Sequence, residues 1–275
     1  MIPVSSGGDA ASIAASLREA VAPVISLSSP QSQTLQEIIF PDGAGKTNFP
    51  RRPSFVTHRA GRQQGIAVAI PGPFDYREGI FLMDHKFQSV KGRSFRELAA
   101  VPEDVEIRFR HDVVAALEGC LEEEVNTALV TIGTGLGFCI AVDGKPRVLE
   151  SGSPADSLWN APYGDGILED KVSARGIRDS YREKTGRTDV SALQIALLAD
   201  GGDIPAMEVY SEVGTLLGDV LLEKAEEYGV ERFLFGGQVS RSLHLMERPI
   251  RNALDGIRVE KAPEGAVFRG LSKLF

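Results

Sequence analysis

Cysteine is scarce in this chain: the 275 residues include only Cys120 and Cys139. The two do not form a CxxC pair, and the four histidines are scattered along the sequence. A structural zinc site needs closely spaced cysteine and histidine ligands, so the sequence predicts no zinc and no other protein-bound metal site. Two buried thiols in a reducing cytoplasm are the expected alternative.

Long apolar runs and an excess of basic charge are also lacking. No apolar run approaches the length of a membrane span, and the first residues, MIPVSSGGDAAS, lack the regions of a secretory signal. Lys and Arg number 30 against 38 Asp and Glu, which gives a formal net charge of −8. This balance disfavours nucleic acid or an anionic membrane as the main partner. We therefore expect a cytoplasmic protein.

What is present suits a globular α/β protein, with 43% apolar and 25% charged residues. Periodicity predicts a helix over residues 9–22 and strand, turn and strand over 23–43. Further expected elements are strands at 51–60, 65–75 and 105–112, a helix at 113–123, helices between 165 and 228, a buried strand from 230, and a final strand and helix. The order predicts two α/β domains, 1–121 and 122–275, with a cleft between them.

Closely spaced glycines follow a strand-like run at Gly133, Gly135 and Gly137. Because the next residues, FCIAVDGK, favour a strand, they do not supply the helix that a dinucleotide fingerprint requires. A hairpin tip whose backbone N–H groups form an anion site remains, with a plain tight hairpin as the alternative. The segment GAGKT at 43–47 lacks the first glycine of a P-loop, because position 40 is Phe40, and is interpreted as a surface turn.

Five segments occur in the order found in one known family: GIAVAIPGPFD, RFRHDVVAALEG, VTIGTGLGFCIAVDGK, GILEDKVSARGI and FLFGGQVSRS. Together they resemble the bacterial ROK family (repressor, open reading frame, kinase) of sugar kinases, which are actin-like ATPases. The resemblance implies a two-domain, ribonuclease H-like α/β fold with a central cleft. It also implies a hexose-type sugar substrate, ATP with Mg²⁺, and a possible homodimer. The zinc-binding cysteines of many family members are absent.

The resemblance implies roles for individual residues. Asp112 would be the general base, with a helix N-cap as the alternative. The β- and γ-phosphates would be held at Gly133, Thr134, Gly135 and Gly137. The adenosine would lie against Gly236 and Gly237, whose alternative role is a turn that needs positive φ. Sugar-contacting positions of the family correspond to Asp84, His111, Ser153 and Asp156.

The first phosphate loop departs from the family pattern. Where the family has DIGGTK, this chain has residues 28–33, SSPQSQ, so the acidic residue is Ser28 and the lysine is Gln33. Pro30 has no N–H to donate to a phosphate. Two hypotheses follow: an ATP-dependent sugar kinase in which another segment substitutes, for example through Lys46, Arg51, Arg52 or Lys86, or a catalytically impaired pseudo-kinase that binds a small molecule or a protein. The repressor branch is not expected, because a winged helix has no room before the first strand.

Overall fold

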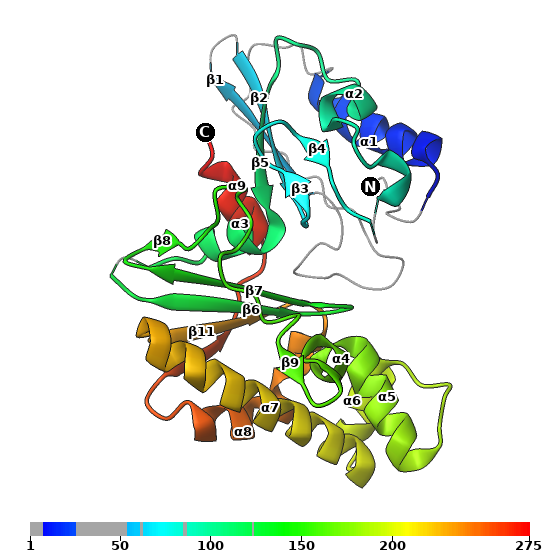
Figure 1. Cartoon of the computed structure of the whole chain (residues 1–275), viewed down its shortest axis with the longest axis vertical. Coiled ribbons are helices and arrows are strands. Elements are labelled where there is room, and N and C mark those ends of the chain that lie inside the picture. The colour runs from blue at the N-terminus through cyan, green and yellow to red at the C-terminus, as the bar shows by residue number, and fades with distance from the viewer. Residues whose placement is uncertain (1–7, 26–53, 61–62, 85–86, 123) are drawn as a thin grey trace. The chain divides into compact units, whose positions relative to one another are not determined.

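The computed structural model describes residues 8–25, 54–60, 63–84, 87–122 and 124–275. They form two compact units (Figure 1). Unit 1 contains the chain up to Cys120 together with residues 148–154 and 265–275, and unit 2 contains residues 121–147 and 155–264. The sequence-based domains, 1–121 and 122–275, put both returning segments of unit 1 in the second half.

Unit 1 is built on a three-stranded sheet in the order β1–β2–β5, which agrees with three strands predicted from the sequence. Its strands are β1 (Ser54–Ala60), β2 (Gln63–Ile70) and β5 (Glu106–His111). β1 is antiparallel to β2, and β2 is parallel to β5 with Ile70 opposite His111. The predicted strand at 65–75 therefore stops at Ile70, and a small hairpin of β3 (Phe74–Asp75) and β4 (Ile80–Phe81) follows.

The helices of unit 1 are α1 (Ala10–Ile25), α2 (Phe95–Ala99), α3 (Asp112–Glu118), α9 (Ala266–Ser272) and the 3-10 helix η1 (Gln88–Val90). The predicted first helix is confirmed: the Ser12 N–H donates to Asp9 Oδ1 at 2.8 Å, and Ile13 and Leu17 are fully buried. The helix continues to Ile25, so the prediction of a strand from Pro23 is wrong for its first three residues. Residues 26–43 lie outside the described part of the chain.

Two glycines let α9 pack closely on α3. A Cβ added to Gly270 would lie 1.7 Å from the Ala115 carbonyl oxygen, and one added to Gly119 would lie 1.9 Å from the Ala266 oxygen. Both neighbours are backbone atoms that cannot move aside, so each glycine is required for this approach. The helix that begins at Asp112 is thereby supported by the last helix of the chain.

Unit 2 contains a five-stranded mixed sheet in the order β12–β11–β6–β7–β8. Its strands are β6 (Thr127–Ile132), β7 (Leu136–Val142), β8 (Lys145–Pro146), β11 (Arg232–Gly236) and β12 (Arg258–Lys261), with a separate hairpin of β9 (Pro162–Tyr163) and β10 (Gly166–Ile167). β11 is parallel to both β6 and β12, whereas β7 is antiparallel to β6 and β8.

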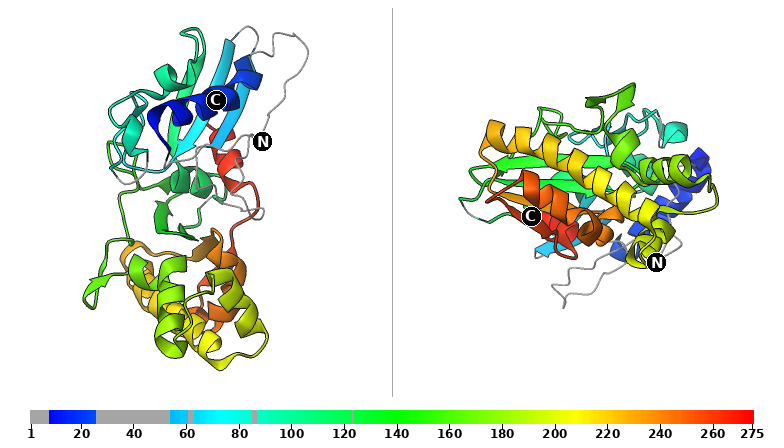
Figure 2. Two further views of the ribbon diagram at one scale, coloured as in Figure 1. Left: turned by 90° about the vertical axis from the view of Figure 1, so that its right-hand side faces the viewer. Right: turned by 90° about the horizontal axis from the view of Figure 1, so that it is seen from below.

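Helices cover this sheet, as the pattern from residue 165 onward predicts. They are α4 (Glu169–Val172), α5 (Ala174–Thr185), α6 (Ala192–Asp200), α7 (Ile204–Tyr228), η2 (Val239–Ser242) and α8 (Leu243–Ala253). The long helix α7 crosses the strands of the sheet (Figure 2, right, yellow) and packs on α8. Buried Val209, Val213, Leu217 and Leu221 repeat every fourth residue along α7 and form its core-facing stripe.

Candidate functional site

The glycine segment of unit 2 is a β-hairpin, as predicted. β6 and β7 pair from Thr127 to Ile132, with Ile132 opposite Leu136, so residues 133–135 form the tip. The Gly133 N–H donates to the Gly135 carbonyl at 2.9 Å and closes it. Gly137 lies in β7, opposite Thr131, rather than at the tip. Three of the four predicted phosphate-binding residues therefore share one short turn.

The tip glycines differ in what surrounds them. A Cβ added to Gly133 would meet nothing within 4 Å, whereas a Cβ added to Gly135 would lie 2.7 Å from Glu169 Oε2. The Leu136 N–H donates to that same oxygen at 2.8 Å. A carboxylate of the chain thus lies against the turn that the sequence assigns to phosphate. Glu169 lies in the quoted segment GILEDKVSARGI, but sequence reasoning gave it no role, because nothing in its spacing connects it with the hairpin.

Gly236 and Gly237, the predicted adenosine contacts, lie beside this hairpin in unit 2. β11 runs parallel to β6 with Gly236 opposite Thr131, so the carboxyl ends of both strands lie at the same end of the sheet. Gly237 has φ +88°, and an added Cβ would lie 2.3 Å from the Ile132 carbonyl oxygen. The structural alternative for Gly237, a turn with positive φ, is confirmed. Ligands of α/β sheets bind at such carboxyl ends, so the two glycine segments together form a candidate nucleotide site.

The predicted general base lies in unit 1, at the end of β5. Helix α3 begins at Asp112, and its N-cap is His111, whose Nδ1 lies 3.3 Å from the Val113 nitrogen. The Val113 N–H also donates to Asp112 Oδ1 at 2.7 Å. His111 therefore occupies the N-cap position that the sequence offered as the alternative role of Asp112. His111 Nδ1 and Asp112 Oδ1 are 3.0 Å apart, so a protonated imidazole would form an ion pair with the carboxylate.

Tyr76 borders this pair and was missed in the sequence. Its hydroxyl donates to the Ile70 carbonyl at 3.0 Å, and its ring centroid lies 5.9 Å from that of His111. Burial raises the pKa of the Tyr76 hydroxyl well above its usual range, and the charge of Asp112 raises it further. A Cβ on Gly152 would lie 3.2 Å from the Tyr76 ring. The segment that carries Ser153 therefore reaches this end of β2 and β5.

The remaining predicted sugar contacts have other partners in the structure. Asp84 is mostly exposed and forms an ion pair with Lys91 at 2.5 Å. Asp156 lies in unit 2, where Oδ1 accepts from the Tyr228 hydroxyl at 2.7 Å and Oδ2 accepts from Arg147 Nε at 3.1 Å. The Arg147 guanidinium also stacks over the Tyr228 ring, with 4.5 Å to its centroid. Both oxygens of Asp156 are therefore engaged by the protein.

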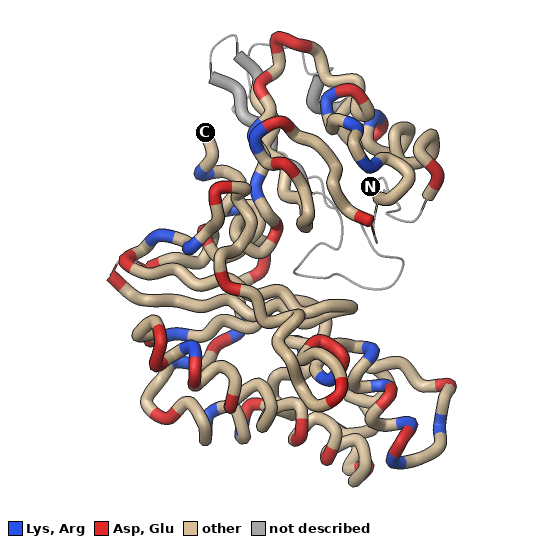
Figure 3. The backbone as a smooth tube through the Cα atoms, in the orientation of Figure 1, with Lys and Arg blue, Asp and Glu red and all other residues tan. Residues whose placement is uncertain are grey.

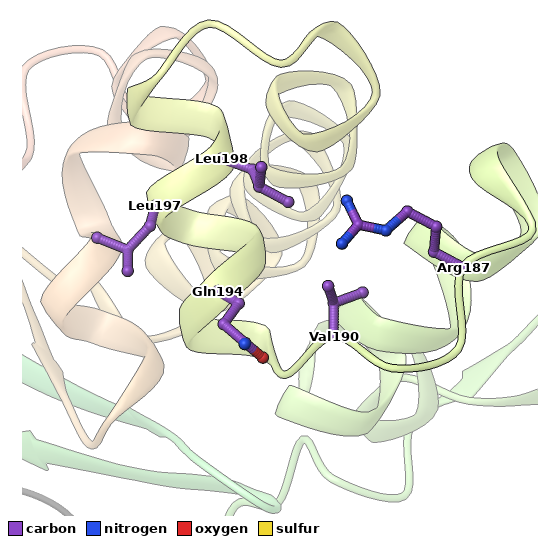
Figure 4. Close-up of a pocket in the computed structure, with 5 residues that line it drawn as sticks. All are labelled: Arg187, Val190, Gln194, Leu197 and Leu198. Atoms are coloured by element: carbon purple, nitrogen blue, oxygen red, sulfur yellow. The ribbon is translucent and has the colours of Figure 1, made fainter.

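A shallow pocket of unit 2 lies between α6 and the loop that precedes it (Figure 4). Its volume is about 280 Å³ and it is lined by Arg187, Val190, Gln194, Leu197 and Leu198. None of the predicted site residues lines it, and its only charged side chain is Arg187. The pocket thus provides no acid, base or nucleophile for the predicted chemistry.

Several predictions concern residues outside the described ranges. These are the first phosphate loop at 28–33, the GAGKT turn, and the substitute cations Lys46, Arg51, Arg52 and Lys86. Within the described ranges, no three His, Cys, Asp or Glu side chains gather as a metal site. Both cysteines are buried. Within the same ranges, no helix has the length and apolar character needed to span a bilayer.

Comparison with known proteins gives one sequence relative. No family model matches the chain. A glucokinase of Halalkalibacterium halodurans is 25% identical over 174 residues, which are 52% of this chain and 51% of the glucokinase. The chain thus matches only about half the length of this curated relative.

Solved structures define the class of the fold. A ROK-family glucokinase of Streptomyces griseus, in complex with glucose and AMPPNP, superposes with a TM-score of 0.63 at 19% identity, over 75% of this chain and 79% of that one. A ROK-family transcriptional regulator, homologous to the MLC protein of E. coli, has a TM-score of 0.62 at 21% identity. The match covers 75% of this chain and 60% of the regulator. The chain therefore has the α/β fold that these ROK-family structures share, which agrees with the predicted fold class.

Within that class, the ROK-family sugar kinases are the proteins that this chain is similar to. The glucokinase match in sequence and the kinase structures in the comparison agree with the resemblance of the five segments. Because a transcriptional regulator shares the same fold, the fold alone does not decide the activity.

Proposed function

We propose that the protein is an ATP-dependent carbohydrate kinase that transfers the γ-phosphate of MgATP to a hydroxyl of a hexose-type sugar. The observation that carries the proposal is that the hairpin tip and the Gly236–Gly237 turn lie side by side at one end of the strands of the unit 2 sheet. The backbone N–H groups of Thr134 and Gly135 would bind the phosphates, because the Gly133 N–H already donates to the Gly135 carbonyl. The turn at Gly236 and Gly237 would admit the adenosine. A glucokinase with this fold binds AMPPNP and glucose, which supports the assignment.

Asp112 is proposed as the general base that accepts the proton of the attacking sugar hydroxyl. Phosphoryl transfer depends mainly on positioning and charge stabilisation, and the hydrogen bond from the Val113 N–H holds one oxygen of this carboxylate in place. His111, Tyr76 and Ser153 are proposed as its sugar-facing neighbours. The engaged oxygens of Asp156 favour a structural role for that residue, whereas the exposed ion pair of Asp84 with Lys91 contributes little to stability.

A non-catalytic pseudo-kinase is the second candidate, and one observation favours it. The first phosphate loop carries Pro30 and Gln31 in place of glycines, and losing even one charge partner of a transition state costs about a hundredfold in rate. In the proposed kinase, magnesium would arrive with the nucleotide. The cytoplasmic location and the homodimer stay predictions.

The test combines calorimetry with MgATP and a coupled assay of ADP release over a panel of sugars. We expect wild-type protein to bind MgATP and to turn over at least one hexose. Asp112→Asn keeps the acceptor for the Val113 N–H but removes the base, so turnover should fall by about a hundredfold or more with nucleotide binding unchanged. Asp104→Asn, which alters an exposed carboxylate of the same unit, is the matched control.

Different outcomes reject different parts of the proposal. No binding at millimolar MgATP would reject the kinase and leave the pseudo-kinase. Binding and turnover that are unaffected in Asp112→Asn would reject Asp112 as the base while retaining the kinase.

A further inference from the structure

We propose that Glu169 is a specificity-determining residue of the nucleotide site. Its carboxylate makes the hairpin bind a nucleotide complexed with a divalent cation in preference to the free nucleotide, which carries more negative charge. The inference rests on the proposed function of unit 2 and adds a residue that the sequence-based assignment did not contain. It concerns the charge of the ligand that the hairpin accepts, and it leaves the chemical step unchanged.

The contact that carries the inference is short and direct. Glu169 Oε2 accepts a hydrogen bond from the Leu136 N–H at 2.8 Å, and the same oxygen would lie 2.7 Å from a Cβ on Gly135. Because Gly135 has no side chain, the Glu169 carboxylate can lie against the hairpin, where a phosphate oxygen would bind. The carboxylate marks the tip as a turn that binds an anionic oxygen.

The backbone around Glu169 holds this carboxylate in position. The Glu169 N–H donates to the Trp159 carbonyl at 3.2 Å, and the Glu169 carbonyl accepts from the Ser173 N–H at 3.1 Å. One residue further on, the Ala174 N–H donates to the Gly133 carbonyl at 2.8 Å. Both ends of α4 are therefore tied down, one of them to the hairpin itself, and the carboxylate is a built-in feature of the tip.

Electrostatics gives the direction of the selection. A free triphosphate that reaches the tip must come close to the Glu169 carboxylate, and like charges a few ångströms apart repel each other strongly where water is partly excluded. A bound divalent cation neutralises part of the phosphate charge, so this repulsion is smaller for the complexed nucleotide. Glu169 therefore weakens binding of free nucleotide more than binding of complexed nucleotide.

The chain offers a matched control in the next residue. Glu169 and Asp170 are the two acidic residues in the first turn of α4, and Figure 3 marks the Asp and Glu positions of the chain in red. Asp170 pairs with Arg175 rather than with the hairpin. Neutralising either residue removes the same formal charge from the same helix, but only one of the two contacts the tip.

The experiment is isothermal titration of ATP, once with EDTA and once with excess Mg²⁺, into wild-type protein, Glu169→Gln and Asp170→Asn. Glutamine retains an acceptor for the Leu136 N–H and loses the charge. We expect Glu169→Gln to bind free ATP about tenfold more tightly than wild type and MgATP about threefold more tightly or less. The ratio of the MgATP affinity to the free ATP affinity therefore becomes smaller. Asp170→Asn should leave that ratio as in wild type. Equal melting temperatures would show that both variants are folded.

If wild-type protein binds MgATP, the proposed function stands and two results would overturn the inference. In the first, Glu169→Gln leaves the ratio of the MgATP affinity to the free ATP affinity unchanged. In the second, Asp170→Asn lowers this ratio as much as Glu169→Gln does. If none of the proteins binds MgATP, the proposed function fails, and titration with inorganic pyrophosphate in EDTA then decides the inference. Pyrophosphate that binds Glu169→Gln about tenfold more tightly than wild type would support it, and no difference would reject it.

Discussion

Asp156 shows at the scale of one residue how a resemblance and a structure can assign different roles. The family pattern places a sugar contact there, but in this chain the carboxylate joins Tyr228 and Arg147 within unit 2. The hydrogen bond to Glu227 raises the pKa of the Tyr228 hydroxyl well above its usual range, and the bond to Asp156 raises it further. The side chain of Asp156 is only 10% exposed, so its carboxylate is satisfied mainly by these protein partners.

We predict that Asp156→Ala lowers the free energy of unfolding by about 1 kcal/mol, because it removes one acceptor from the Tyr228 hydroxyl and one from the Arg147 guanidinium. Urea denaturation measures the change. In the coupled sugar assay the KM for the sugar should stay as in wild type. A normal unfolding curve together with a raised KM would instead support the sugar-binding role.

At the scale of secondary-structure elements, the packing of α7 on α6 depends on a buried phenol. The Tyr210 hydroxyl donates to the Ala192 carbonyl at the start of α6, at 3.0 Å, and the side chain is 1% exposed. Burial raises the pKa of Tyr210 to about 12, and the charge of Asp200 adds to the shift. The folded state therefore holds the phenolic proton more tightly than the unfolded chain does.

This shift predicts an alkaline loss of stability. The contribution of the raised pKa is complete below about pH 10 and is lost as the pH rises toward 12, and it amounts to about 2 kcal/mol. Tyr210→Phe cannot ionise and also lacks the hydrogen bond to Ala192. The variant should therefore be less stable than wild type by about 1 kcal/mol at pH 8 and at least as stable at pH 12. Denaturation curves at several pH values measure this, and a constant difference would contradict it.

At the scale of the whole molecule, the chain leaves unit 1, builds unit 2 and returns to unit 1 for its last helix. In that helix, α9, Val267 and Leu271 are buried and Phe268 is nearly so. Burying three side chains of this size contributes on the order of 5 kcal/mol, which is comparable to the net stability of a small domain. Unit 1 is therefore expected to depend on residues distant in the sequence.

Deleting residues 265–275 should unfold unit 1 selectively. We expect backbone amides of β5 and α3 to lose their protection in hydrogen exchange measured by mass spectrometry. Amides of β6 and β11, which belong to unit 2, should keep theirs. Retained protection in α3 would show that α9 contributes little, and equal loss in β6 would show that the two units unfold together.

Local patterns were enough to predict most elements of the described chain. The four-residue spacing of Ile13, Leu17 and Val21 indicates α1, and β-branched residues on both sides of the glycines indicate the hairpin. These patterns report which face of a segment is buried, and that face is a local property. The predicted strand at Pro23–Ile25 is wrong because α1 continues through Pro23, and a proline beyond the first turn is normally unfavourable in a helix.

Local residue patterns therefore predict the α/β order of elements, the hairpin, and the strand ends at Asp112 and Gly236. Packing in three dimensions brings distant groups together: Glu169 at the hairpin, Gly237 against Ile132, and Tyr76 beside His111. The physical reason is that periodicity records burial without recording the partner. A contact between segments exists only once packing has placed their backbones within hydrogen-bonding distance.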